Sequence, residues 1–302
     1  MTKTKRKQRV SNLIIDSNNL LHRAHWIAES RGGDMSTPYL FLNSIKKYVK
    51  MFGPDNIYTV WDKKLAPELK NFRLTNDRIE YKATRDKDRN DKVYKHEPII
   101  RKIVKYLGVR NIYPGVMEGD DVAAYLSTHL PGSNIIVSVD QDFLQLVNDN
   151  ISVYSPIKDI LITRSNFFDI VDVEIKDFLK YKALLGDKSD NIPGIPKVGE
   201  KTAKKIIKTG IDTLSSQHLE IFHNNMKLMS LKRGYTTYKN ESLIYKRQVD
   251  RLSTLKPDMQ GFLNICESLN MKQVTKNINE WKSLFTNDEQ LVLTIQKLIN
   301  SL

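Results

Sequence analysis

Short apolar runs alternate with helix-like patterns through the first half of the chain. The runs at residues 13–15, 57–61 and 135–139 are rich in β-branched and aromatic residues, which is typical of buried strands. Between them lie amphipathic segments such as 99–107, whose apolar residues recur at helical spacing. Alternation of strands and helices predicts an α/β fold with a central, mostly parallel sheet flanked by helices.

Two later parts of the chain depart from this alternation. Residues from about 63 to 95 are highly charged and contain few aliphatic anchors, so we expect an excursion between a strand and the next helix. From about residue 174 the pattern is helical, with a Pro- and Gly-rich break at 192–199. The sequence therefore divides into a basic tail at 1–10, a core at 11–173 and a helical region at 174–302.

Composition and charge narrow the class of protein. The 302 residues carry a net charge of +13, with 48 Lys and Arg against 35 Asp and Glu, which indicates a polyanionic partner such as nucleic acid. No apolar run approaches the roughly 20 residues of a membrane helix. The basic tail lacks the apolar stretch of a secretion signal, and is either mobile or a weak contact to nucleic acid.

A single cysteine, Cys266, excludes an internal disulfide and a cysteine-rich zinc site. It suits a reducing compartment, so we expect a cytoplasmic protein without a membrane anchor.

Aspartates follow the predicted strands. Asp16, Asp62 and Asp140 each end one of them, and ligands bind beyond the carboxyl ends of parallel strands. Aspartate is also a common turn residue after a strand, which is the alternative for any one of the three. Together they predict one crevice.

Further acids accompany these three. Asp142 lies two residues after Asp140, Glu118 and Asp120 precede a helical run, and Asp187 and Asp190 lie near the Pro/Gly break. Carboxylates that converge without counter-ions repel one another, and hard divalent cations such as Mg²⁺ resolve that repulsion. Two such ions roughly 4 Å apart can serve phosphodiester displacement. The chain has no His-x-x-x-His spacing and no pair of cysteines, so zinc is a poor choice.

The order and spacing of these stretches resemble the 5′–3′ exonuclease and flap endonuclease superfamily. That superfamily includes the 5′-nuclease domain of bacterial DNA polymerase I and stand-alone phage flap endonucleases, and this chain resembles the stand-alone type. The most specific match is the stretch at 182–194, which contains Gly-Asp-Lys-Ser-Asp at 186–190 and is followed by 198–203. The matching stretches are 13–20, 60–62, 118–124, 138–146, 182–194 and 198–203. The resemblance implies a PIN-like 5′-nuclease core, a helical arch at about 63–95 and a helix-hairpin-helix-like element at about 185–210.

The resemblance also implies two Mg²⁺ sites, in which Mn²⁺ can substitute. The first would be formed, directly or through water, by Asp16, Asp62, Glu118, Asp120 and Asp140. The second would be formed by Asp142, Asp187 and Asp190 with help from Asp140. Asp121 is either an outer partner of these ligands or a helix cap.

The basic residues receive DNA-binding roles from the same resemblance. Lys82 and Arg85 at the arch base would contact the scissile phosphate, and Tyr81 would stack on a displaced base. Contacts to phosphates are implied for Lys182 and for the helix that carries Lys201, Lys204 and Lys205. Relatives hold a K⁺ ion at the hairpin, but many have Gly-Ile-Gly where this chain has Lys-Val-Gly at 197–199, which leaves the K⁺ site open.

These features predict a metal-dependent 5′ nuclease acting on DNA at single-strand/double-strand junctions, in replication or repair. A replicative polymerase or a single-strand-binding protein is a candidate partner. The resemblance to bacterial and phage nucleases implies a monomer in bacterial or phage-infected cytoplasm. Two alternatives stay open: a nuclease that removes RNA primers from RNA–DNA hybrids, and a DNA-binding protein without catalysis. The sequence does not decide among flaps, nicks, gaps and hybrids.

Overall fold

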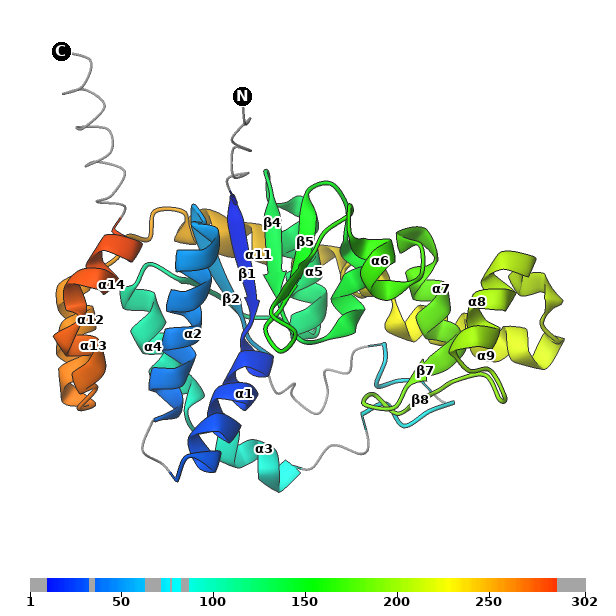
Figure 1. The fold of residues 1–302 in the computed structure, drawn as a ribbon, viewed down its shortest axis with the longest axis horizontal. Helices are drawn as coiled ribbons and strands as arrows, with labels where there is room; N and C mark the ends of the chain where they lie inside the picture. The colour runs from blue at the N-terminus through cyan, green and yellow to red at the C-terminus, as the bar shows by residue number, and fades with distance from the viewer. Residues whose placement is uncertain (1–9, 33–35, 63–71, 77, 83–86, 287–302) are drawn as a thin grey trace, which may run out of the picture.

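A six-stranded sheet forms the centre of the molecule, as the computed structural model in Figure 1 shows. The structure describes residues 10–32, 36–62, 72–76, 78–82 and 87–286. The strand order is β3-β2-β1-β4-β5-β6, and every neighbouring pair is parallel except β5 and β6. The strands are β1 (Asn12–Asp16), β2 (Asn56–Val60), β3 (Arg110–Ile112), β4 (Asn134–Val137), β5 (Ile151–Ser155) and β6 (Ile160–Ile162).

The mostly parallel sheet confirms the predicted fold class, and the three predicted strands are β1, β2 and β4. Leu13, Ile14 and Ile15 of β1 are fully buried, because helices cover both faces of the sheet. The flanking helices of the first half are α1 (Ser17–Ser30), α2 (Thr37–Phe52), α3 (Lys87–Tyr94), α4 (Glu97–Tyr106) and α5 (Gly119–His129).

Alternate residues of β1 pack against different layers. Leu13 and Ile15 pack in one cluster with apolar residues of α1, α2 and α4, whereas Ile14 packs in another with α5 and the 3₁₀ helix η1 (Gln141–Leu146). The start of α2 illustrates the local signals: Ser36 caps the helix at the Tyr39 amide, and Gly53 ends it in the left-handed region with φ 56°.

A third, smaller cluster lies beside the sheet, at the right of Figure 1. It contains α7 (Ile175–Leu185), α8 (Glu200–Thr209), α9 (Ser216–Met229) and the hairpin of β7 (Gly186–Asp187) and β8 (Ile192–Pro193). The glycines of this hairpin are required by close approach. A Cβ on Gly194 would lie 2.2 Å from the Leu185 carbonyl oxygen, and one on Gly186, at φ 74°, would lie 2.3 Å from the Gly194 nitrogen.

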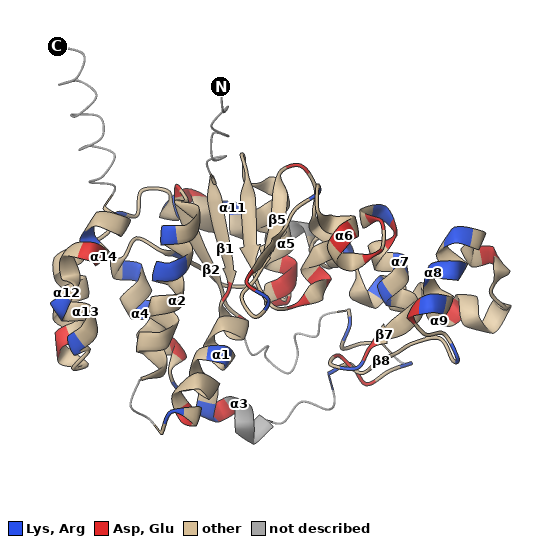
Figure 2. Ribbon diagram, viewed as in Figure 1, with Lys and Arg blue, Asp and Glu red and all other residues tan. Residues whose placement is uncertain are grey.

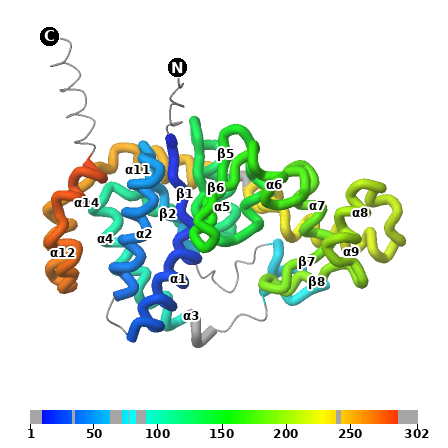
Figure 3. The backbone as a smooth tube through the Cα atoms, in the orientation of Figure 1, coloured from blue at the N-terminus to red at the C-terminus, as the bar shows by residue number. Residues whose placement is uncertain are grey.

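Helices after α9 return to the sheet, although no sequence motif marks them. Tyr235 and Tyr245 join the cluster under α5, while Phe262 and Trp281 join the cluster on the α1–α2 side. The tube in Figure 3 shows this last group beside α2 and α4. The remaining elements are α6 (Phe167–Val171), η2 (Ile211–Thr213), α10 (Leu231–Thr237), α11 (Lys239–Leu252), α12 (Met259–Ser268), α13 (Lys272–Lys276) and α14 (Ile278–Phe285).

Across the described ranges, no helix has the length and apolar character needed to cross a membrane.

Candidate active site

Three aspartates lie at one edge of the sheet, where the parallel strands end. Asp16 is the last residue of β1 and pairs in register with Val60, so Asp62 lies two residues beyond β2 at the same edge. Asp140 follows β4, the other neighbour of β1. The edge also carries a cleft of about 10 Å³, which is close to the volume of one water-sized particle. The cleft is lined by Asp16, Asn18, Val60, Asp62, Gly119, Asp120 and Ala123.

Hydrogen bonds orient the carboxylates at this edge. Asp16 accepts from the Asn19 amide at 3.1 Å and from the Ser138 hydroxyl at 2.6 Å, and so caps α1. Ser138 Oγ in turn accepts from the Asp140 amide at 3.0 Å. Ser138 therefore links the carboxylate after β1 to the chain after β4.

Burial and mutual repulsion raise the pKa values of these acids. The pKa of Asp16 rises to about 7, because the carboxyl is buried and faces the charges of Asp62 and Asp140. Burial and the neighbouring acids also raise the pKa of Asp120 well above its ordinary value and raise that of Asp140. The cluster therefore favours a bound proton or cation near neutral pH.

A second group lies between η1 and the β7–β8 hairpin. Lys182 Nζ is 3.1 Å from Asp142 Oδ1 and 2.7 Å from Asp187 Oδ2. Burial and the charge of Asp140 raise the pKa of Asp142 to about 7. Burial also acts on Asp187, but Lys182 and Ser189 outweigh it and lower its pKa. One lysine ammonium thus bridges both carboxylates and offsets part of their charge.

The third group joins residues 78–82 to α5 and the hairpin. Lys82 Nζ lies 2.6 Å from Glu118 Oε1, and the Tyr81 hydroxyl lies 3.0 Å from Glu118 Oε2 and 2.9 Å from Asp190 Oδ2. Burial raises the pKa of Glu118, but Lys82 and Arg73 reverse that effect and bring it below its ordinary value.

The position of Tyr81 corrects one expectation. We expected its ring to stack on a displaced base, but the residue is only 8% exposed and packs in the cluster with Leu184 and Ile192. Burial and the charges of Glu118 and Asp190 raise its pKa well above the ordinary value, so the hydroxyl keeps its proton. In this arrangement Tyr81 supports the carboxylates and does not offer a stacking face.

Asp121 forms a buried ion pair with Arg73. The two guanidinium nitrogens of Arg73 lie 2.6 and 2.8 Å from the Asp121 oxygens, and Nε donates to the Leu228 carbonyl at 2.7 Å. Asp121 Oδ2 is 3.4 Å from the Glu118 amide at the start of α5. Asp121 therefore combines the two roles considered for it: it completes the capping box of α5, and it is an outer partner of Glu118 through Arg73, which lies 3.2 Å from that carboxylate.

The donor set fits a hard divalent cation, since every acid named above offers oxygen and the group includes no thiolate or imidazole. Among the described residues, no three His, Cys, Asp or Glu side chains are grouped closely enough to hold a metal ion as they stand. Three of the carboxylates form ion pairs with lysines instead: Glu118 with Lys82, and Asp142 and Asp187 with Lys182. Mg²⁺ keeps several waters when it binds, so this wider spacing is compatible with water-mediated ligation.

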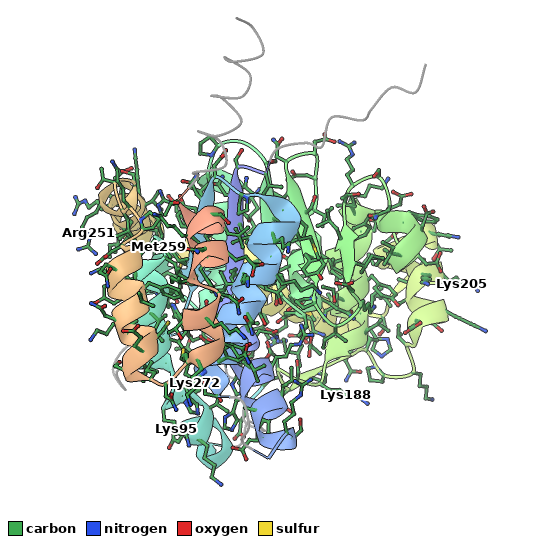
Figure 4. All side chains as sticks on the ribbon, turned by 60° about the vertical axis from the view of Figure 1, so that its left-hand side comes forward. Lys95, Lys188, Lys205, Arg251, Met259 and Lys272 are labelled. Carbon is green, nitrogen blue, oxygen red and sulfur yellow. The ribbon has the colours of Figure 1, made fainter. Side chains whose placement is uncertain are left out.

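The helix-hairpin-helix-like element presents lysines at the start of α8. Lys201 and Lys205 are exposed, whereas Lys204 pairs with Asp172 at 2.5 Å. Figure 2 shows the basic residues of α8, and Lys205 points outward in Figure 4. Lys197, which stands where many relatives have glycine, adopts φ 64°. The chain therefore keeps the left-handed turn without the glycine.

Some predicted residues lie outside the described ranges, and some contacts were not predicted. The residues outside the described ranges are Arg85, residues 1–9 and most of the charged residues between Asp62 and α3. The sequence did not predict the contacts of Asn18, Arg73 and Ser138, because each of these residues bonds to a partner distant in sequence. A buried arginine among charged residues has no periodic signal that separates it from its exposed neighbours.

Comparison with known proteins agrees with this geometry. The family model described as 5′-3′ exonuclease, N-terminal resolvase-like domain, matches residues 11–174, and the model described as 5′-3′ exonuclease, C-terminal SAM fold, matches 173–277.

Among curated proteins, a 5′-3′ exonuclease of Buchnera aphidicola is 30% identical over 227 residues, which span 72% of this chain and 75% of that protein. Flap endonuclease Xni of Shewanella woodyi is 32% identical over 199 residues, 65% of this chain and 76% of that protein. The fold matches that of a bacteriophage T5 flap endonuclease with DNA and metal ions, with TM-score 0.64 and 21% identity over 85% of this chain and 99% of that one.

Proposed function

The chain belongs to the 5′-3′ exonuclease family, and from that premise we propose how its residues divide the work of a DNA nuclease. The reaction is hydrolysis of phosphodiester bonds near 5′ ends and 5′ flaps of DNA, consistent with relatives named 5′-3′ exonuclease and flap endonuclease. The observation that carries the proposal is the acidic edge of the sheet, where buried acids with raised pKa values face one cleft.

The acids of this edge form two metal sites for Mg²⁺, with Mn²⁺ as a substitute. Divalent ions there supply charge for the developing phosphate transition state and lower the pKa of water. The first site is formed by Asp16, Asp62, Glu118, Asp120 and Asp140. The second is formed by Asp142, Asp187 and Asp190, with Asp140 between the two.

Lys82 and Lys182 bind the scissile phosphate by exchanging a carboxylate partner for a phosphate oxygen. Both ammonium groups already lie among the acids, and their side chains are 17% and 14% exposed, so a short shift presents them to substrate. Arg85 lies outside the described residues, and its proposed role, contact with the same phosphate, rests on the family resemblance alone. Positive charge held at the reacting phosphate stabilises the charge that develops there.

Duplex DNA binds along the start of α8, where Lys201, Lys204 and Lys205 contact phosphates. The turn before α8 holds a K⁺ ion through its backbone carbonyls. Lys197 is compatible with this site because its backbone adopts the left-handed conformation that glycine favours. The protein acts as a monomer in a reducing cytoplasm, which suits its one buried thiol. Its partner at the DNA junction is a polymerase or a single-strand-binding protein.

Cleavage of a 5′-labelled flap duplex, with matched nicked and RNA–DNA hybrid substrates, tests this function. We expect products only with Mg²⁺ or Mn²⁺, none with EDTA, and the fastest cutting on DNA junctions. Tight junction binding without metal-dependent cutting would favour the non-catalytic DNA-binding protein. Preference for the hybrid would favour the primer-removal nuclease.

A further inference from the structure

Asn18 makes three hydrogen bonds that together enclose the chain at Asp62. Its Oδ1 accepts from the Asp62 amide at 3.0 Å, and its Nδ2 donates to Asp62 Oδ2 at 3.2 Å and to the Tyr94 hydroxyl at 3.1 Å. Asn18 lies in the first turn of α1 and is 8% exposed, so water does not compete freely for these bonds. Each of the two Nδ2 hydrogens has a partner, and the amide has one orientation that satisfies all three contacts.

Asp62 depends on these bonds because packing does not hold its side chain. The residue is exposed, although its neighbour Trp61 is fully buried. Asp62 Oδ1 accepts from the Gly119 amide at 2.8 Å, and Oδ2 accepts from Asn18. A Cβ on Gly119 would lie 2.7 Å from Oδ1, so the start of α5 packs closely against this carboxylate. One carboxylate oxygen is thus oriented from α5 and the other from α1.

The third hydrogen bond of Asn18 links the Asp62 carboxylate to α3. Tyr94 is the last residue of α3, and its ring also packs edge-on against His22 of α1 at 5.5 Å between centroids. Tyr94 is therefore linked to Asp62 through the Asn18 amide. A shift of α3 relative to α1 would change the partner of one Nδ2 hydrogen and, with it, the orientation of the amide that holds Asp62.

We propose that Asn18 is a positioning residue that orients the Asp62 carboxylate for metal binding and couples it to Tyr94 of α3. The proposal rests on the proposed function, since it concerns how a ligand of that site is presented. Groups that orient a ligand through a hydrogen bond commonly change metal affinity about 10- to 100-fold when they are removed. Only a side chain with one acceptor and two donors, in the asparagine geometry, makes all three bonds.

Calorimetric titration of the DNA-free protein with Mn²⁺ tests the positioning role without a turnover readout. We expect Asn18→Leu, which has a similar size and no polar atoms, to weaken Mn²⁺ binding about tenfold or more. Tyr94→Phe removes a single hydroxyl and should weaken it about threefold. The double variant should bind as Asn18→Leu does, because both changes act through one amide.

Matched controls make the same exchanges elsewhere. Asn43→Leu alters a half-buried asparagine of α2, and Tyr106→Phe removes a hydroxyl at the end of α4. Both should bind Mn²⁺ as the parent does. The Mg²⁺ concentration that gives half-maximal cleavage of a flap duplex should rise in Asn18→Leu by the same factor as the Mn²⁺ affinity falls, whereas DNA binding in EDTA should not change.

Mn²⁺ binding by Asn18→Leu within about twofold of the parent would overturn the positioning role. Weakened binding in Asn18→Leu with unchanged binding in Tyr94→Phe would overturn the coupling to α3. If Asn18→Leu does not fold, Tyr94→Phe decides, and parent-like affinity there ends the proposal. A parent protein that binds no Mn²⁺ would instead refute the proposed metal sites, and the inference would fall with them.

Discussion

Raised pKa values among the strand-end aspartates give the acidic edge its chemistry. Asp16 and Asp142 have pKa values of about 7 because they are buried near other acids. Stability alone does not explain such a group, because apolar residues at the same positions would avoid the free-energy cost of desolvating charged carboxylates. The arrangement is explained if cations occupy the edge during function.

Asp140→Asn should abolish cleavage and leave junction binding largely intact. The exchange keeps the size of the side chain and removes a charge shared by both proposed sites. Cleavage of a flap duplex in Mg²⁺ and binding of the same duplex in EDTA measure the two effects separately. Full activity in the variant would remove Asp140 from the site.

The contribution of Asp16 to the stability of the metal-free protein should fall as pH rises from about 4 to about 7. The folded state of Asp16 has a pKa of about 7 against an ordinary value of 3.8, so within this window the folded chain binds more protons than the unfolded chain. Asp16→Asn should lack this contribution. Urea unfolding in EDTA at several pH values should show the parent's advantage over Asp16→Asn shrinking as pH rises. A difference that is constant across the window would contradict the raised pKa.

Gly234→Ala should destabilise the protein by about 3 kcal/mol, because it disturbs a buried ion pair. A Cβ at Gly234 would lie 1.8 Å from Asp121 Oδ1, which is bonded to the buried Arg73. Gly199→Ala is the control, since no atom lies within 4 Å of its Cβ, and it should cost less than about 1 kcal/mol. Equal urea midpoints for the two variants would argue against the ion pair.

At the scale of elements, β1, β2 and β4 could be predicted from sequence because each is a short apolar run, with an aspartate at its end or within three residues beyond it. Strand β3 could not, because Arg110 and Asn111 interrupt its apolar pattern at the edge of the sheet. The acidic set followed from the same logic. Its hydrogen-bonded partners did not, because Arg73 and Asn18 find theirs only after long-range folding.

Helix α8 should contribute to DNA affinity through phosphates, without base specificity. Lys205→Ala should lower the slope of log affinity against log salt by about one. Lys272→Ala on α13 is the matched control, since its side chain is also exposed but lies on the opposite end of the molecule (Figure 4). Equal salt slopes for both variants would place the DNA elsewhere than α8.

At the scale of the whole molecule, the last described helices stabilise the layer that carries the acidic edge. Trp281 is 1% exposed and packs with Phe262 and Phe285, while Lys46 of α2 pairs with Glu280 at 2.6 Å. These contacts give the segment after α11 a structural role that no motif indicates.

Trp281→Ala should destabilise the protein by about 3–5 kcal/mol, as is usual for loss of a buried tryptophan. Ile157→Ala, at a residue that is 70% exposed between β5 and β6, should change the unfolding free energy by less than about 0.5 kcal/mol. Urea unfolding measures both. A small effect of Trp281→Ala would show that the C-terminal helices unfold separately from the sheet.

The central claim is that acids from separate elements form one cation-binding edge on which cutting depends. Equilibrium dialysis of the purified protein against Mn²⁺, with Asp140→Asn in parallel, tests it most directly. The account predicts about two ions per parent chain and loss of binding in the variant. A parent chain that binds no Mn²⁺, or a variant that binds as many ions as the parent, would contradict it.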